Sequence, residues 1–270
     1  MKVISSKPDT LAEYLDKILQ HRSLIVVFAW RDLRIKYAQT WLGLSWTILQ
    51  PLSAVVIFTL FFSVILQLHS SYPYILFVLS GILFWGFFNF IFSHGSSSLL
   101  SNQDLIRKMN FPKIALPFSK VLMALAEFGI TFLLLIAVIL FFQIPFRLTM
   151  LLMPFVLIPV LLFSLGLALI LSSLTIKNRD LFHIIPFLVN FGIWFTPVFY
   201  PVSLIPTEYS AYSNILFINP VAAGIQLFRW SFFGEQLNFY VAIGIGISFI
   251  TFLIGFYFFK NSEDKIIDLL

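Results

Sequence analysis

The chain of 270 residues is 60% hydrophobic and 18% aromatic, and only 11% of its residues are charged. This apolar excess excludes an ordinary soluble domain, because a chain of this length cannot bury 34 phenylalanines away from water. The net charge of +5 is interpreted as a membrane-topology signal and not as a nucleic-acid site, and the lack of cysteine excludes disulfides and thiolate metal sites.

Residues 1–40 are predicted to lie on the membrane surface as an amphipathic segment. The capping box Thr10-Leu-Ala-Glu13 opens a helix that runs to about residue 20. A second helix, over 23–39, carries an apolar stripe flanked by Arg31, Arg34 and Lys36. Their long side chains can reach the lipid headgroups while their stems stay in apolar surroundings.

Six apolar stretches follow, each long enough to cross the ~30 Å hydrocarbon layer as a helix. They cover residues 41–67, 73–95, 114–143, 148–175, 181–200 and 237–259. With these spans, 15 of the 17 lysines and arginines fall on the side of both termini. The positive-inside rule therefore predicts that both termini, including a tail over 261–270, are cytoplasmic.

Two loop segments are predicted to form short helices. In the cytoplasmic loop 101–110, Asn102 can cap a helix whose apolar residues face a protein partner or, alternatively, pack on the bundle. These apolar residues are Leu105, Ile106 and Met109. The external segment 209–233 holds two pieces too short to cross the bilayer, the second beginning at Asn219 and Pro220, so both are expected to be re-entrant.

The sequence lacks several kinds of catalytic motif. It has no G-x-x-x-x-G-K-[ST] loop, so this chain is not expected to hydrolyse ATP by itself, and it has no H-E-x-x-H or G-x-S-x-G motif. Glu127 is the one charged residue deep in a predicted span, either as a functional group or as a protonated partner of a neighbouring helix. One such group is too few for an ion-coupled carrier.

Aromatic residues gather near the first and fifth predicted spans. Trp41 and Trp46 fit either an interfacial belt or a binding surface. Phe191, Trp194 and Phe195 neighbour the polar residues Asn190 and Thr196, an arrangement that suits stacking on sugar rings, although helix packing explains it equally well.

The segment "RDLRIKYAQTWLGLSWTILQPL", at 31–52, resembles the start of the first span in permease subunits of the ABC exporters for O-antigen, capsule and teichoic acid polysaccharides, the ABC-2 type permeases. Further matching segments follow in the same order and extend the resemblance over nearly the whole chain. They are "NQDLIRKMNFPKIALP", "NRDLFHIIPFLVNFGIWFTPVFY", "INPVAAGIQLFR" and "FFKNSEDKIIDLL".

This resemblance implies an all-α membrane protein with six transmembrane helices, an N-terminal interfacial helix and two re-entrant helices before the sixth span. It also implies a homodimer in the bacterial inner membrane that works with two ATPase subunits, which bind ATP and Mg²⁺, while this chain holds no cofactor or metal. The expected substrate is an undecaprenyl-diphosphate-linked polysaccharide such as O-antigen. Alternatives are teichoic acid, capsule, a drug or a small lipid, and, in another class, a membrane-embedded glycan enzyme or scaffold.

The resemblance also suggests roles for particular residues. The diphosphate headgroup would meet Arg31, Arg34, Lys36 and Tyr37, although these cations also suit a plain topology anchor. The channel aromatics would be Trp41, Trp46, Phe191, Trp194 and Phe195. The ATPase would contact Asp104, Leu105, Ile106, Arg107, Lys108, Asn178, Arg179 and Asp180. The external gate would include Asn219, Pro220 and Gly224. No role is assigned to Glu127 or to Gln50, which departs from the family pattern before Pro51.

Overall fold

The computed structural model is all-helical over the residues it describes, which are 10–38, 41, 43–65, 67, 71–206, 208 and 214–269. In this part of the chain, five helices are long and apolar enough to cross a membrane, judged by length and composition. They are Trp46–Ile65, Tyr74–Ser97, Ala115–Phe141, Leu148–Lys177 and Tyr240–Glu263. The predicted all-α class is therefore confirmed, whereas the six predicted spans are not all found.

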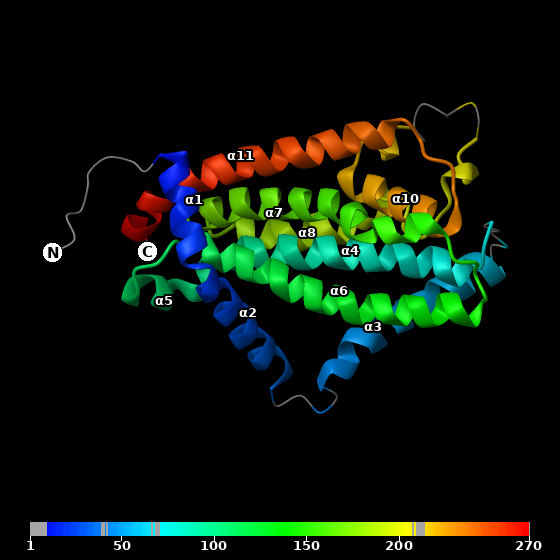
Figure 1. The fold of residues 1–270 in the computed structure, drawn as a ribbon, viewed down its shortest axis with the longest axis horizontal. Coiled ribbons are helices and arrows are strands. Elements are labelled where there is room, and N and C mark those ends of the chain that lie inside the picture. Colours follow the sequence, from blue (N-terminus) through cyan, green and yellow to red (C-terminus); the bar gives the residue numbers. More distant parts are fainter. Residues whose placement is uncertain are drawn as a thin grey trace.

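The two N-terminal helices, α1 (Leu11–Gln20) and α2 (Arg22–Tyr37), form as predicted. The Thr10 hydroxyl accepts from the Glu13 amide at 3.3 Å, and the Glu13 carboxylate accepts from the Thr10 amide at 2.8 Å, which completes the capping box. Helix α1 lies at the end of the bundle where α11 finishes, and α2 runs diagonally away from it to meet α3 at a corner (Figure 1).

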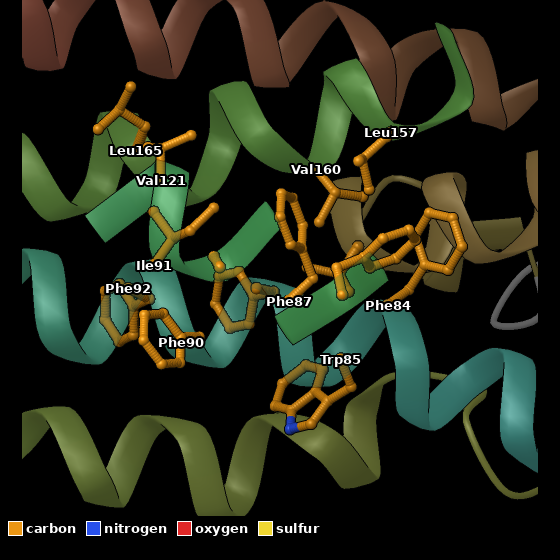
Figure 2. Close-up of a cluster of buried hydrophobic side chains, with 14 of the residues drawn as sticks. Phe84, Trp85, Phe87, Phe90, Ile91, Phe92, Val121, Leu157, Val160 and Leu165 are labelled. Carbon is orange, nitrogen blue, oxygen red and sulfur yellow. The ribbon is translucent and has the colours of Figure 1, made fainter. Parts of the chain in front are cut away.

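Helix α4 (Tyr74–Ser97) forms the centre of the core, packed between α6 (Ala115–Phe141) and α7 (Met153–Lys177). It is apolar on every side, as expected for a helix surrounded by others. Figure 2 shows Trp85 on the side of α4 that faces α8, whereas Phe84 and Phe87 lie on the side where α7 contributes Leu157 and Val160.

Small residues allow the remaining long helices to approach closely. A Cβ added at Gly166 of α7 would lie 2.7 Å from the carbonyl oxygen of Thr251 in α11 (Tyr240–Leu269). A Cβ at Gly255 of α11 would in turn meet the backbone of Gly166. The backbones of α7 and α11 are therefore in direct contact, a packing mode that membrane helices favour.

Helix α10 (Pro220–Phe233) forms where the second short piece of 209–233 was predicted. Asn219 caps it by accepting from the Val221 amide at 3.0 Å, and Gly234 ends it with a positive φ of 76°. The helix lies at the end of the bundle opposite α1 (Figure 1). The first predicted external piece begins at 209–213, which lie outside the described residues.

Helices α3 and α8 lie at the periphery of the bundle. Their ends differ from those of two predicted spans, 41–67 and 181–200. The predicted span 41–67 begins too early, because the helix α3 (Trp46–Thr59) starts after a 3-10 turn at Gly43–Ser45 and continues as π-helix Leu60–Ile65.

The predicted span 181–200 ends too late. Helix α8 (Leu181–Gly192) continues only through a 3-10 turn at Ile193–Phe195. Its 15 residues reach about 22 Å at 1.5 Å each, less than the ~30 Å of the hydrocarbon layer. Thr196 is extended, with φ −117° and ψ 132°, because it precedes Pro197, and a residue before proline disfavours the helical conformation.

Candidate binding cavity

A cavity of about 610 Å³ lies between the end of α2 and helices α3, α4, α6 and α8. Its wall combines charged, hydroxyl and amide groups with aromatic rings. The polar lining residues are Lys36, Tyr37, Thr47, Gln50, Asn89, His94, Glu127, Thr131 and Asn190. Such a mixed lining suits a ligand that offers both polar groups and apolar faces.

The charged part of the wall centres on one oxygen of Glu127. The Lys36 ammonium pairs with Glu127 Oε1, and the Tyr37 hydroxyl donates to the same oxygen at 3.2 Å. The hydroxyls of Tyr37 and Thr47 lie 2.8 Å apart, so Thr47 can donate to Tyr37. Burial is the main cause that raises the pKa of Tyr37, so its phenol remains a neutral donor at neutral pH. This group, the Lys36–Glu127 cluster, joins α2, α3 and α6.

The aromatic part of the wall includes three tryptophans, Trp46, Trp85 and Trp194. They come from α3, α4 and the turn after α8, so no single sequence segment contains the surface that they form. Aromatic faces of this kind pack against the C–H faces of sugar rings, while hydroxyls find polar partners such as Gln50 and Asn190.

The structure divides the four residues that were expected to hold a headgroup. Lys36 and Tyr37 line the cavity. Arg31 instead bonds to Asp32 and Asn102, and Arg34 stacks on Trp30, 5.1 Å from its ring centroid, along an outer groove of α2. The physical reason is helix geometry, since Lys36 lies five positions after Arg31, which turns its side chain about 140° around the helix axis from that of Arg31.

The expected channel aromatics are also divided. Trp46 and Trp194 line the cavity, but Trp41 is 99% exposed and precedes α3. Phe191 and Phe195 are 54% and 70% exposed on the outside of α8 and its turn. None of these three rings is among the residues that line the cavity.

Two residues singled out without a role, Gln50 and Glu127, prove to line the cavity, and sequence reasoning missed Trp85, Asn89 and His94. Polarity could have identified Asn89 and His94 as site residues, because both interrupt a mainly apolar helix, α4. Trp85 gave no signal, since one more aromatic residue in "FWGFFNFIF" looks like the rest of the core.

The short helix α5 (Gln103–Lys108) forms as predicted, with one correction. Asn102 stands at the N-cap position, directly before the helix, but makes no capping bond, because its amide donates to Ser98 O and its oxygen accepts from Arg31, both at 2.8 Å. Of the two alternatives for the apolar residues of α5, packing on the bundle holds for Ile106, which is buried in the core with 4% exposure. Leu105 is half-buried against the same core.

The surface that α5 leaves exposed is charged, with Met109 beside it. Asp104, Arg107 and Lys108 are exposed, and Met109 is 46% exposed. The turn between α7 and α8, formed by Asn178, Arg179 and Asp180, is also exposed. Helix α5 lies at the end of the bundle that carries α1 (Figure 1).

Further contacts fix this end of the bundle. Glu263 of α11 accepts from the Tyr14 hydroxyl of α1 and from the Lys113 amide that follows α5. Asp32 of α2 pairs with Lys120 of α6 at 2.5 Å. The segment from Asn102 to Lys113 is therefore anchored at its start by α2 and at its end by α11.

At the opposite end, the expected gate residues hold α10 in place. The Asn219 side chain, besides capping the helix, donates to the Thr196 hydroxyl at 2.9 Å. Pro220 is buried at the first turn. A Cβ at Gly224 would collide with Val160 of α7, so this glycine permits the close approach of α10 to α7.

In the described residues, no three His, Cys, Asp or Glu side chains gather where they could hold a metal ion.

Comparison with known proteins places the chain among related sequences. Residues 23–233 match the family model described as ABC-2 type transporter. The chain is 31% identical over 223 residues to the O-antigen export system permease protein RfbA of Myxococcus xanthus, covering 82% of this chain and 84% of that protein. Two proteins of the same description from Klebsiella pneumoniae are 27% identical over 253 residues, covering 92% of this chain and 95% of each.

Proposed function

Because this chain belongs to the ABC-2 type transporter family, we propose that it is the transmembrane subunit of an ATP-driven exporter that moves O-antigen polysaccharide out of the cytoplasm. The relatives described as O-antigen export permeases support this proposal, since they align with most of the chain. The chain is a multi-pass membrane protein of the bacterial inner membrane and a transporter subunit.

The proposed topology has six spans, with α8 as a short fifth span and both termini in the cytoplasm. Residues 1–40 would form the interfacial segment, 41–260 the membrane domain with its coupling helix at 101–110, and 261–270 the tail. The external helices at 209–233 would be re-entrant and act as a gate. The distribution of lysine and arginine supports this arrangement, as does the location of α5 and α10 at opposite ends (Figure 1).

The proposed assembly is a homodimer with two ATPase subunits. Apolar side chains are exposed on the π-helix that follows α3, such as Phe61 at 49%, and on α8, such as Phe187 at 58%, and a second copy could cover them. ATP and Mg²⁺ would bind to the ATPase subunits, because the sequence of this chain has no phosphate-binding loop. Closure of those subunits would move α5, which Arg31 connects to α2.

The proposed substrate is a polysaccharide linked to undecaprenyl diphosphate. The cavity is the observation that supports this proposal most directly, because the cation of Lys36 and the rings of Trp46 and Trp194 line the same cavity. A lipid diphosphate followed by sugars offers a partner for each kind of group. A capsule or teichoic acid polymer has similar chemistry and is the second candidate.

Export from a strain that lacks this gene tests the function. The strain should lose surface O-antigen, and the wild-type gene should restore it. Replacing both Trp46 and Trp194 by alanine should lower export about tenfold, because two stacking surfaces are removed from the cavity. Surface O-antigen measured by immunoblot reports the result.

The control for this experiment is Phe239→Ala, which removes an aromatic ring that is 81% exposed and lies outside the cavity. It should leave export unchanged. Normal surface O-antigen in the deletion strain would exclude this function, and restoration of a capsule or teichoic acid polymer instead would select the second candidate.

Binding of the ATPase partner should depend on the exposed side of α5. The double variant Arg107→Glu and Met109→Asp is expected to reduce ATPase co-purification about tenfold or more, because it reverses a charge and removes an apolar contact on one small surface. The control is Arg22→Glu, an exposed charge reversal at the start of α2 and outside α5. Full ATPase retention in the double variant would show that α5 is not the docking surface.

A further inference from the structure

We propose that Lys36 and Tyr37 form a binding site for a phosphate-bearing ligand, and that the Glu127 carboxylate fills this site until the ligand displaces it. This inference rests on the proposed function, because the exported substrate would carry the phosphate. Glu127 would then determine specificity, because only a ligand with more negative charge than one carboxylate could replace it.

The geometry of the Lys36–Glu127 cluster supports an anion site. An ammonium and a phenol hydroxyl converge on a single carboxylate oxygen, and Thr47 supports the phenol from behind. The Lys36 ammonium also lies 4.9 Å from the Phe90 ring centroid, which helps to hold it at the wall of the cavity. Converging donors of this kind suit a phosphate oxygen as well as a carboxylate oxygen.

The charges of the cavity explain why Glu127 would act as a substitute for the ligand. Among the cavity-lining residues of the described chain, Lys36 and Glu127 are the two that carry a formal charge. The Glu127 side chain is 17% exposed and that of Lys36 is 40% exposed, so the pair is partly withdrawn from water but can be reached. A cation in such a place is unfavourable without an anion, and Glu127 provides one from within the chain.

Displacement is favoured only for a ligand with more negative charge than one carboxylate. A phosphate or diphosphate meets this condition and can accept from Lys36 and Tyr37 together, whereas a neutral sugar cannot replace the carboxylate. The exchange has a structural consequence, because the pair connects α2 with α6. Ligand binding would replace a helix-to-helix contact by a helix-to-ligand contact at the edge of the cavity.

Binding measurements on the full-length chain in complex with its ATPase test this inference. The complex is placed in phosphatidylcholine nanodiscs and titrated with farnesyl diphosphate or inorganic pyrophosphate, followed by the fluorescence of the cavity tryptophans. Glu127→Gln keeps the size of the side chain but removes its charge, so it should bind the diphosphate probes about tenfold more tightly. The double variant Lys36→Met and Glu127→Gln should show no such gain, because the cation is absent.

A matched control is Asp32→Asn. It neutralises a different carboxylate, which belongs to α2 and pairs with Lys120 outside the cavity. It should leave the affinity unchanged. If the Glu127→Gln variant binds only farnesyl diphosphate more tightly, the site takes a lipid-linked diphosphate. If it binds both probes more tightly, the site takes the diphosphate group itself. Equal or weaker binding of both probes by a folded Glu127→Gln complex would overturn the inference.

If Glu127→Gln does not yield a folded complex, Lys36→Gln provides the second test. It should weaken binding of both probes about tenfold, and unchanged binding would overturn the inference. Failure here is distinct from failure of the proposed function, since the wild-type gene would still restore surface O-antigen to the deletion strain.

Discussion

Replacing Arg229 by leucine is expected to lower the stability of the folded protein by about 3–5 kcal/mol, because several hydrogen bonds to a charged group are lost, and to abolish export. Arg229 lies in α10 and is only 3% exposed. Its guanidinium donates to the carbonyl oxygens of Phe77 at 2.9 Å, Pro197 at 3.0 Å and Val198 at 3.3 Å. Leucine would fill part of the space but would remove every hydrogen bond that the guanidinium donates in this buried place, which is the costly outcome.

Arg229 connects helix α10 to its neighbours. It joins α10 to α4 and to the irregular residues that follow α8, and it lies 3.5 Å from the Phe77 ring centroid. Without it, the proposed gate would lose its buried polar attachment to the core. Thermal unfolding of the purified protein, followed by the fluorescence of its tryptophans, measures the loss of stability.

Two further variants define what Arg229 contributes. Arg229→Lys should have a stability between those of the wild type and Arg229→Leu. Lysine keeps the charge but lacks the planar guanidinium that donates to several carbonyl groups at once. Arg22→Leu, the control, removes an exposed arginine from the start of α2 and should change the unfolding temperature little. An Arg229→Leu variant as stable as the wild type would show that this attachment is dispensable.

Replacing Gly255 by alanine is the second change with a large expected effect. The new methyl group would collide with the backbone of Gly166, and backbone atoms cannot rotate away as a flexible side chain can. Helices α7 and α11 would have to separate, at an expected cost of about 3 kcal/mol or more, at the upper end of the range for overpacked cores. The yield of monodisperse protein and its unfolding temperature report the effect.

The same helix provides the matched control. At Gly246 of α11, an added Cβ would meet no atom within 4 Å. Gly246→Ala should therefore be neutral or slightly stabilising, because alanine favours the helix over glycine. Equal stability of the Gly255→Ala and Gly246→Ala variants would contradict direct contact between α7 and α11.

The sequence by itself determined most helices and several of their ends. The Thr10–Glu13 capping box and the Asn219 cap both form where the local pattern predicts them. The predicted span 73–95 corresponds to α4 at Tyr74–Ser97. These features are local, because a cap involves residues within one turn and an apolar run of about 20 residues needs no information from the rest of the chain.

Only the tertiary structure decided which helix faces meet. Lys36 reaches Glu127 across 91 positions, and Arg31 reaches Asn102 across 71, so the cationic residues of α2 divide between two sites. Ile106 is buried for the same kind of reason, since the core beneath α5 comes from other helices. Periodicity shows which residues share a face, but in a membrane protein a face against lipid and a face against protein are equally apolar. Hydropathy cannot distinguish these two environments, so the cavity and its charged pair emerge only when the helices are packed.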